Sequence, residues 1–334
     1  MKPAILLLLV LACRRPVSAQ HIELLTDNNK ISFRGLCPVD DKIIWVSGSQ
    51  GTVGRSVDGG KSWQWLTVKN FEKRDFRDIE AFDSLTAIIM AIDGPANILK
   101  TTDGGRNWKI VFTDSTKGMF LDAMNFSGSY GVVIGDPIDH KIFMAFTNDG
   151  GNSWKISTIL KDINTAEGEA FFAASGTNIC LLSKTYAPIF VSGGTQSSIY
   201  ISSTAKHILP IAQGQNSTGA NSLAMAPDRS GKAVIVGGDF AKDTAANNNC
   251  VLLTLFPYQT TIPQTPPHGY RSCVEYLSEN KLICCGVSGV DISEDGGRNW
   301  KLISSTGFHV CRKAKNGKQI FLAGANGNIG RLDW

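Results

Sequence analysis

Residues 56–63 read SVDGGKSW, and the same pattern returns as TTDGGRNW at 101–108, TNDGGNSW at 147–154 and SEDGGRNW at 293–300. We call these four segments the Asp-Gly-Gly boxes. Their aspartates are 45, 46 and 146 residues apart, and 146 is close to three further repeats of about 49 residues. A fixed period of this size indicates a repeat architecture, in which each repeat forms one small structural unit.

The segments around the boxes predict four short strands in each repeat. Apolar runs rich in β-branched residues occur at 43–46, 88–91, 131–134, 179–182, 233–236, 281–285 and 319–323. A shorter strand is expected before each run, at 33–37, 76–81, 120–126, 169–173, 221–226, 271–277 and 308–312. Four strands in about 45 residues are typical of a β-propeller blade. We therefore predict an all-β, seven-bladed β-propeller; six blades are the alternative if 239–264, the most degenerate stretch, is misread.

The two ends of the chain predict how the ring of blades closes. The last repeat stops at Trp334 after three expected strands, at 308–312, 319–323 and 328–334. The segment His21–Thr26 resembles the outer strand at 301–304 and can supply the missing fourth strand. Because a blade shared by both ends leaves no open sheet edge, the N-terminal strand is expected to close the last blade.

Composition and the N-terminus predict an exported globular protein. With 43% hydrophobic and 19% charged residues, the chain is neither disordered nor fibrous. Residues 1–19 have a basic start, a short apolar run and small residues before Gln20, as a signal peptide does; a lipoprotein cut before Cys13 is the alternative. Without this leader the formal charge falls from +4 to +1, which gives no indication of a nucleic-acid partner. Residues 20–334 are expected to form one domain in the periplasm, on the cell surface or outside the cell.

The boxes themselves are expected to stabilise the fold and to take no part in chemistry. An aspartate can accept hydrogen bonds from the amides of its turn, and paired glycines allow positive φ where the chain reverses. A tryptophan then buries a large apolar surface beside the turn. The residues assigned this structural role are Asp58, Trp63, Asp103, Trp108, Asp149, Trp154, Asp295 and Trp300.

This box pattern resembles the Asp-box, or BNR, repeat of the sialidase-like superfamily, and the run of close boxes resembles the photosystem II stability/assembly-factor-like family. The resemblance covers essentially all of residues 20–334. It implies a propeller whose boxes lie on the face opposite the ligand site. It does not imply photosynthesis, because nothing in the sequence indicates a plastid or a thylakoid partner.

Polar residues open the first strand of each repeat, where strands buried on both faces should be apolar. Aligning the repeats gives a row of Arg34, Arg77, Leu121, Gly168, Asn221, Arg271 and His309, followed by Gly35, Asp78, Asp122, Glu169, Ser222, Ser272 and Val310. The rows predict either a hydrated channel mouth or a binding funnel whose arginines suit an anion. Longer loops at 211–219 and 258–270 lead toward it. The candidate ligand-binding residues are Arg34, Arg77, Asp78, Asp122, Glu169, Asn221, Tyr270, Arg271 and His309.

Other chemistries are not supported by the sequence. The five histidines show no metal-ligand spacing, no nucleotide-binding motif or nucleophile elbow is present, and no cofactor or metal is expected. Seven cysteines remain after residue 19, and Cys273 and Cys285 could face each other across a hairpin. Their strand positions also suit small buried residues.

Two functions are weighed from these residues. The first is an exported, monomeric, non-enzymatic binding or assembly propeller of the bacterial cell envelope, which recognises a protein or glycan at the funnel. The alternative is a sialidase-like glycosidase, in which the three arginines would hold a substrate carboxylate. Glu169, Asp122 or Asp78 would then supply acid/base function and Tyr270 a nucleophile. Against it, Phe33-Arg34-Gly35-Leu36 stands where sialidases typically carry Arg-Ile-Pro.

Overall fold

The computed structural model describes residues 20–26, 30–182, 187–201 and 205–333. The expected leader and Cys13 lie outside this part. Within it the chain forms 29 strands and two 3-10 turns, Phe240–Lys242 and Ala325–Gly327. The predicted all-β class is therefore confirmed. None of the described segments forms a helix of the length and apolarity needed to span a membrane.

Four sheets each use four consecutive antiparallel strands. Second strands such as β3 and β7 are buried along their whole length, which explains the continuous apolar runs in the sequence. Outer strands such as β5 alternate between half-buried and exposed residues. The four sheets are β2–β5 (Phe33–Pro38, Ile44–Gly48, Thr52–Ser56, Gln64–Thr67), β6–β9 (Phe76–Ala81, Ala87–Ala91, Ala96–Thr101, Lys109–Asp114), β10–β13 (Leu121–Ser127, Tyr130–Ile138, Lys141–Thr147, Lys155–Ile156) and β23–β26 (Cys273–Tyr276, Leu282–Gly286, Gly289–Ser293, Lys301–Ser304).

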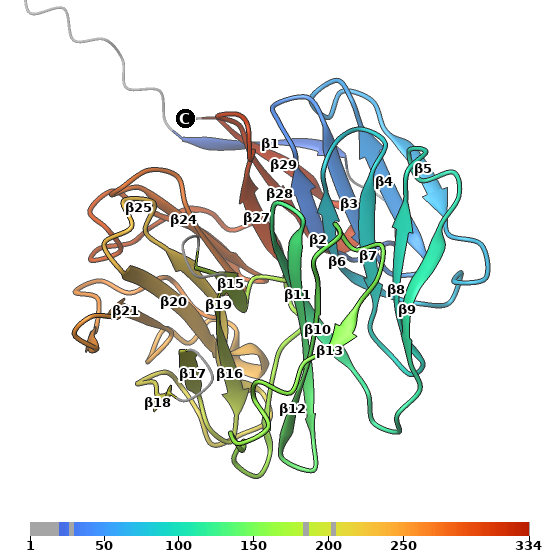
Figure 1. Cartoon of the computed structure of the whole chain (residues 1–334). Helices are drawn as coiled ribbons and strands as arrows, with labels where there is room; N and C mark the ends of the chain where they lie inside the picture. Colours follow the sequence, from blue (N-terminus) through green and yellow to red (C-terminus); the bar gives the residue numbers. More distant parts are fainter. Residues whose placement is uncertain (1–19, 27–29, 183–186, 202–204, 334) are drawn as a thin grey trace, which may run out of the picture.

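Another sheet joins the two ends of the chain, as the sequence predicts. Strand β1 (His21–Thr26) pairs antiparallel with β29 (Ile329–Asp333), which continues through β28 (Ile320–Ala323) to β27 (Val310–Lys313). The innermost strands follow one another around a common centre, and β27 contacts β2, so that the ring closes (Figure 1). The N-terminal strand thus covers the edge that β29 would otherwise expose.

The remaining strands form one nine-stranded sheet, which departs from the expected pattern. Its two parts meet at a single residue pair, Gly193 and Gly219. The expected first strand at 169–173 is reduced to β14, and the run at 179–182 is no second strand: β15 lies innermost against β16. The strands are β14 (Glu169–Ala170), β15 (Ile179–Leu181), β16 (Pro188–Gly194), β17 (Ser198–Ile201), β18 (Ala205–Ile208), β19 (Thr218–Met225), β20 (Lys232–Asp239), β21 (Cys250–Thr254) and β22 (Gln259–Thr261).

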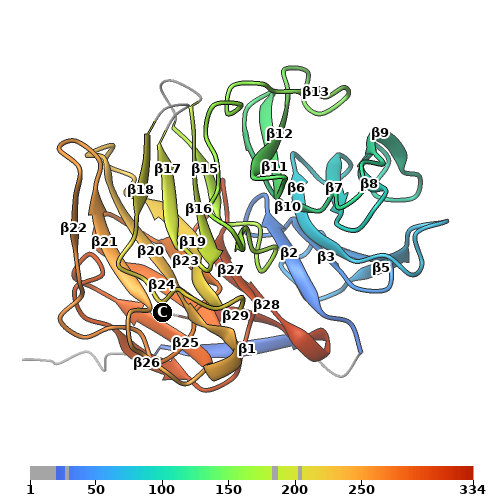
Figure 2. The same cartoon turned by 90° about the horizontal axis from the view of Figure 1, so that it is seen from below.

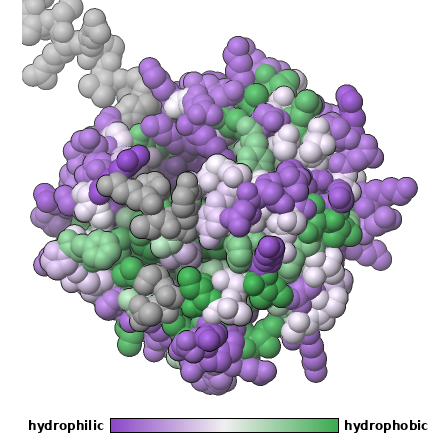
Figure 3. Space-filling view, in the orientation of Figure 1, coloured by the Kyte–Doolittle hydropathy of each residue, from purple (hydrophilic) through white to green (hydrophobic). Residues whose placement is uncertain are grey.

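The hydrophobic core lies between neighbouring sheets. Trp45 of β3, Phe76 of β6 and Ile89 of β7 are fully buried in one such cluster, and equivalent clusters fill other junctions of the ring. Figure 2 shows β19 to β22 following one another from the interior to the outside. In Figure 3 hydrophilic side chains cover most of the rim, and hydrophobic residues form scattered patches between them. Packing between sheets thus supplies apolar burial that one small sheet lacks.

Each Asp-Gly-Gly box connects the third strand of its sheet to the outer strand. In the first box Asp58 accepts hydrogen bonds from the Ser56 hydroxyl and the Ser62 amide, both at 2.9 Å, and the Gly60 amide donates to Ser56. The bonds from Ser62 are the main reason that the pKa of Asp58 is lowered to about 2. The same bonds recur around Asp103, Asp149 and Asp295, and the Trp63, Trp108 and Trp300 indoles donate to a box glycine carbonyl.

Candidate functional site

A β-bulge near the start of the first strand recurs in four of the repeats. The register with the second strand shifts between Phe33 and Gly35, and it shifts in the same way in β6, β10 and β19. A bulge leaves one residue without a direct partner and redirects its side chain. The residues at the bulges are Arg34, Arg77, Asp122 and Asn221.

Ser272 and His309 hold corresponding places before β23 and β27. The Ser272 amide donates to the Cys285 carbonyl although Cys273 is the registered partner of Cys285. His309 likewise donates to the Ala323 carbonyl, and Ala323 is paired with Val310. The sequence alignment therefore placed Leu121 and Arg271 one residue away from the bulge positions, which Asp122 and Ser272 occupy. The alternation of strand residues does not reveal the extra residue that a bulge adds.

A cavity of about 470 Å³ opens at the bulge end of the first strands. Asp136, near the end of β11, and Val287, between β24 and β25, also line it. Since successive antiparallel strands turn at alternate ends, the boxes lie at the end of the sheets opposite this cavity. Five of the candidate residues line the cavity: Arg34, Arg77, Asn221, Tyr270 and His309.

The segment between β14 and β15, residues 171–178, crosses the centre of the ring, and its residues 171–174 line the cavity. Ala174 accepts a hydrogen bond from Arg34 at 3.2 Å, and Ser175 donates to the Ser272 carbonyl at 2.7 Å. The Thr177 hydroxyl donates to Ser222 at 2.6 Å. One segment thus contacts first strands from several sheets. It explains why the expected strand at 169–173 is broken.

Two arginines give the cavity a positive wall. Burial, and then the charge of Arg77, lower the pKa of Arg34 below its ordinary value. Arg77 Nη2 lies 3.7 Å from Asp75, and its buried Nε has no hydrogen-bond partner among the described residues. Burial and the charges of both arginines lower the pKa of His309 to about 3, so its imidazole is neutral near pH 7. The two guanidinium groups are therefore the fixed cations of this wall.

Buried acids lie beside the arginines, and burial favours their neutral forms. Asp136 accepts a hydrogen bond from the Phe171 amide at 2.8 Å, and burial raises its pKa to about 6. Asp122 is fully buried, and neither of its carboxyl oxygens has a hydrogen-bond partner among the described residues. Burial, and then the charge of Asp136, raise the pKa of Asp122 well above its usual range.

Four of the nine candidate residues do not line the cavity, and Asp122, described above, is one of them. Asp78 accepts hydrogen bonds from the Ile79 and Met124 amides, both at 2.8 Å, and burial raises its pKa to about 7. Glu169 is hydrogen bonded by Lys206 and Tyr200, both at 2.7 Å. Arg271 points away from the ring of Arg34 and Arg77: fully buried, it is paired with Asp291. These three residues tie strands together.

Sequence reasoning missed several residues of the site. Asp136 follows the end of an apolar run, where a strand-to-strand connection was expected but no role was assigned. Phe171, Phe172 and Phe240 bring aromatic surface to the cavity, and only the tertiary path of 171–178 reveals the first two. Of the loops expected to lead toward the site, 258–270 contributes Tyr270, whose hydroxyl donates to Asn221 at 2.8 Å, and 211–219 contributes no lining residue.

The closed ring of sheets and its central cavity define the class of the fold: it is a β-propeller. A structure titled as YCF48 bound to D1 peptide aligns with a TM-score of 0.66 at 16% identity, covering 96% of this chain and 98% of that chain. YCF48 from Cyanidioschyzon merolae aligns at 0.62 and 14% identity, covering 93% and 98%. The WD40 β-propeller domain of Doa1 aligns at 0.63 and 13% identity, covering 93% and 97%. No family model and no curated protein sequence matches the chain.

Proposed function

We propose that this chain is a non-enzymatic binding or assembly propeller whose central cavity holds an anionic segment of a partner protein. The observation that carries the proposal is the pair of cavity arginines. Arg34 and Arg77 lie close enough for the charge of one to lower the pKa of the other, and the Arg77 Nε has no hydrogen-bond partner among the described residues. A carboxylate accepts two parallel N–H bonds from a guanidinium and would offset this repulsion.

The proposal extends to the organisation of the protein. Residues 20–334 would form one monomeric domain of seven blades, four of which carry an Asp-box, with the nine-stranded sheet supplying two of the seven. Residues 1–19 would direct export to the bacterial cell envelope. The ring of first strands, in which β15 contacts both β10 and β19, supports this blade count.

A protein segment is favoured over a glycan for two reasons. YCF48, a propeller of similar extent, has been solved with a peptide bound. The cavity also combines cations with the aromatic rings of Phe171, Phe172 and Phe240, a surface on which an extended peptide can place both a carboxylate and apolar side chains.

The glycosidase alternative is less well supported by the geometry. Hydrolysis of this type requires two carboxyl groups on either side of the scissile bond. Among the described residues that line the cavity, Asp136 is the one carboxylic acid. Asp78 and Glu169, which that mechanism would use, are hydrogen bonded within and between strands. The cavity is thus better suited to holding an anion than to transferring a glycosyl group.

A thermal-shift panel tests the proposal. Short acidic peptides with a free C-terminal carboxylate should raise the melting temperature of the parent by mass action, and their amidated neutral versions should raise it less. The double variant Arg34→Gln with Arg77→Gln should lose this response. Arg106→Gln, which changes an exposed arginine at a box, should keep it. Added salt should weaken the response by screening.

The same panel distinguishes the alternatives. Sialic acid, uronic acids, phosphate and neutral sugars are tested on the same three proteins, with aryl-glycoside substrates for hydrolysis. A larger shift with an acidic sugar than with any peptide would replace the protein partner by a glycan. Turnover of an aryl glycoside would establish the enzymatic alternative. Equal responses of the parent and the double variant would leave only a hydrated channel mouth.

A further inference from the structure

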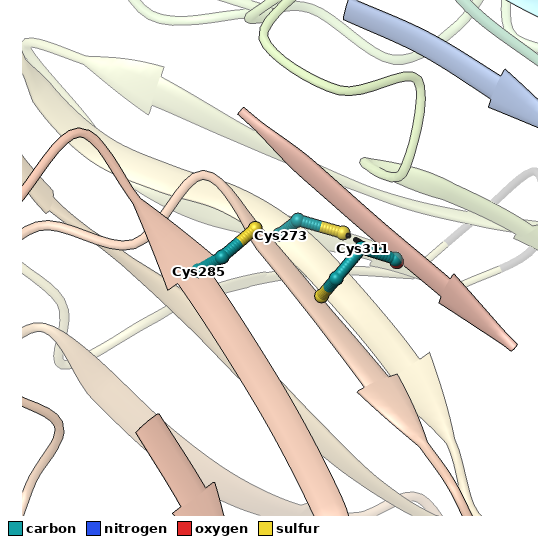
Figure 4. Close-up of side chains that lie close together, drawn as sticks. All are labelled: Cys273, Cys285 and Cys311. Atoms are coloured by element: carbon teal, nitrogen blue, oxygen red, sulfur yellow. Dashed lines mark hydrogen bonds between the residues drawn. The ribbon is translucent and has the colours of Figure 1, made fainter. Parts of the chain in front are cut away.

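Three cysteine sulfurs meet in the core, and none of these cysteines lines the cavity or belongs to a box. Cys273 of β23 is the registered partner of Cys285 on β24, as the sequence suggested, and Cys311 comes from β27 of the neighbouring sheet. Each residue is fully buried, and the three sulfur atoms lie within 4.8 Å of one another. Figure 4 shows that the three side chains lie close together. All three thiols are free in this structure.

The surroundings leave these thiols with weak partners. The Cys273 sulfur lies 3.3 Å from the Cys311 carbonyl oxygen, and the Cys311 sulfur lies 4.0 Å from the Ile283 carbonyl oxygen. Thiols are weak donors, so losing these contacts costs little. The neighbouring cation is Arg312, the residue after Cys311, and it is ion-paired with Glu275 at 3.5 Å. The cluster therefore holds three polarisable sulfurs whose hydrogen-bond partners are weak.

We propose that Cys273, Cys285 and Cys311 form a binding site for one soft monovalent metal ion, Cu(I). The donor set contains only sulfur, which selects Cu(I) or Zn(II) over hard ions. Structural zinc is almost always four-coordinate, and no fourth histidine, cysteine or carboxylate among the described residues joins the group. Three sulfurs without a fourth ligand therefore favour Cu(I).

The geometry requires only a small contraction. Because no two of the sulfurs are more than 4.8 Å apart, an ion at their centre lies at most about 2.8 Å from each, and metal–thiolate bonds are about 2.3 Å. Each sulfur would move inward by at most about half an ångström. Three thiolates and Cu(I) carry two net negative charges, and the neighbouring cation, Arg312, is shared with Glu275. Because the sulfurs are fully buried, the ion would enter during folding or local opening.

The test uses the full chain, reduced and refolded without oxygen in Cu(I) buffered by a chelator. Parent protein should retain one ion that Cys273→Ala and Cys311→Ala both lose. Cys284→Ala is the matched control: Cys284 is equally buried on β24 but faces another hydrophobic cluster, so this variant should retain the ion. Circular dichroism identifies the variants that fold, and X-ray absorption of the parent should show three sulfur neighbours at copper.

Several outcomes would overturn the proposal. A refolded parent that retains no Cu(I), or that exchanges it for Zn(II) at equal concentration, lacks the site described. The same holds if Cys284→Ala loses the ion or if a folded Cys311→Ala variant keeps it. The absorption measurement on the parent needs no variant, so a copper centre without three sulfur neighbours would decide the matter even if both alanine variants failed to fold.

Discussion

The box hairpins and the inner bulges are two sets of repeated features that differ in what they repeat. In the boxes, both the backbone and the side chains recur: an aspartate accepts the same bonds at Asp58 and Asp103. At the bulges the register shift recurs, but the residue changes from Arg34 to Asp122 to Asn221. The boxes satisfy their polar groups locally, whereas the bulge residues reach beyond their own sheets.

This difference separates stability from binding. A box makes its hydrogen bonds within about eight residues, so each copy can hold its own hairpin with the same chemistry. A bulge directs its side chain toward the centre of the ring, and residues of different types can occupy that position. Substitutions in the boxes should therefore change the free energy of unfolding, and substitutions at the bulges should change ligand responses.

The largest effect is expected for Trp300→Ala. The Trp300 side chain is buried among residues of two sheets and donates to the Gly297 carbonyl. Its removal should lower the free energy of unfolding by about 3–5 kcal/mol. Trp108→Ala should cost less, because Trp108 is only half-buried. Chemical denaturation measures both changes. If either folded variant lost its response to acidic peptides, the boxes would not be purely structural.

The repeat, most of the strands and the closing strand could be predicted because they follow from local patterns; the strands expected at 169–173 and 179–182 were the exceptions. Within the site, Phe33-Arg34 and Phe76-Arg77 gave the correct register. Tyr270-Arg271 has the same aromatic-arginine pattern, but Ser272 and not Arg271 holds the bulge position. A bulge adds a residue that the periodicity of a strand does not show. The crossing of 171–178 could not be predicted either, because its partners come from other sheets.

The sulfur cluster was beyond sequence reasoning for a similar reason. Cys273 and Cys285 could be paired from the hairpin between them, and the structure confirms that they are partners. Cys311 joins them only because β27 packs beside β23. Metal-ligand spacing along the chain is informative when ligands share a turn or a helix, and this group shares neither.

Two aspartates should give opposite responses to pH. Asp78 has a raised pKa of about 7, so the folded state keeps a proton that the unfolded state releases above about pH 4. The stability from this proton is present at low pH and is lost as the pH rises through 7, by at most about 4 kcal/mol. Asp103 has a lowered pKa of about 2, so its contribution is present above pH 4 and is lost as the pH falls through 2.

Unfolding measured from pH 2 to 8 distinguishes the two residues. Asp78→Asn should reduce the change in the free energy of unfolding with pH between pH 4 and 7. Asp103→Asn should reduce that change below pH 4. The slopes are compared and not the absolute stabilities, because either amide also disturbs hydrogen bonds. An unchanged slope above pH 4 in Asp78→Asn would mean that Asp78 is ionised in the folded protein.

Gly176→Ala tests the segment that crosses the ring. Gly176 has a φ of 67°, in the left-handed region, and a Cβ there would overlap the Asp78 carboxylate. The substitution should lower the free energy of unfolding by roughly 2 kcal/mol. Gly118→Ala is a control, since it has positive φ but open space around it. Equal losses in both variants would show that backbone strain alone, and not the crossing, explains the effect.

The smallest change in stability is expected for Arg77→Gln. The Arg77 side chain is partly exposed, its Nε is unpartnered among the described residues, and its charge opposes that of Arg34. Its replacement should therefore leave the free energy of unfolding within about 0.5 kcal/mol of the parent, or raise it slightly as repulsion is relieved. The same variant should show a much smaller melting-temperature rise with an acidic peptide. Denaturation with and without peptide measures both quantities on one sample. A loss of stability comparable to that of Trp300→Ala, with the peptide response intact, would place Arg77 among the structural residues and erase the distinction between bulge and box.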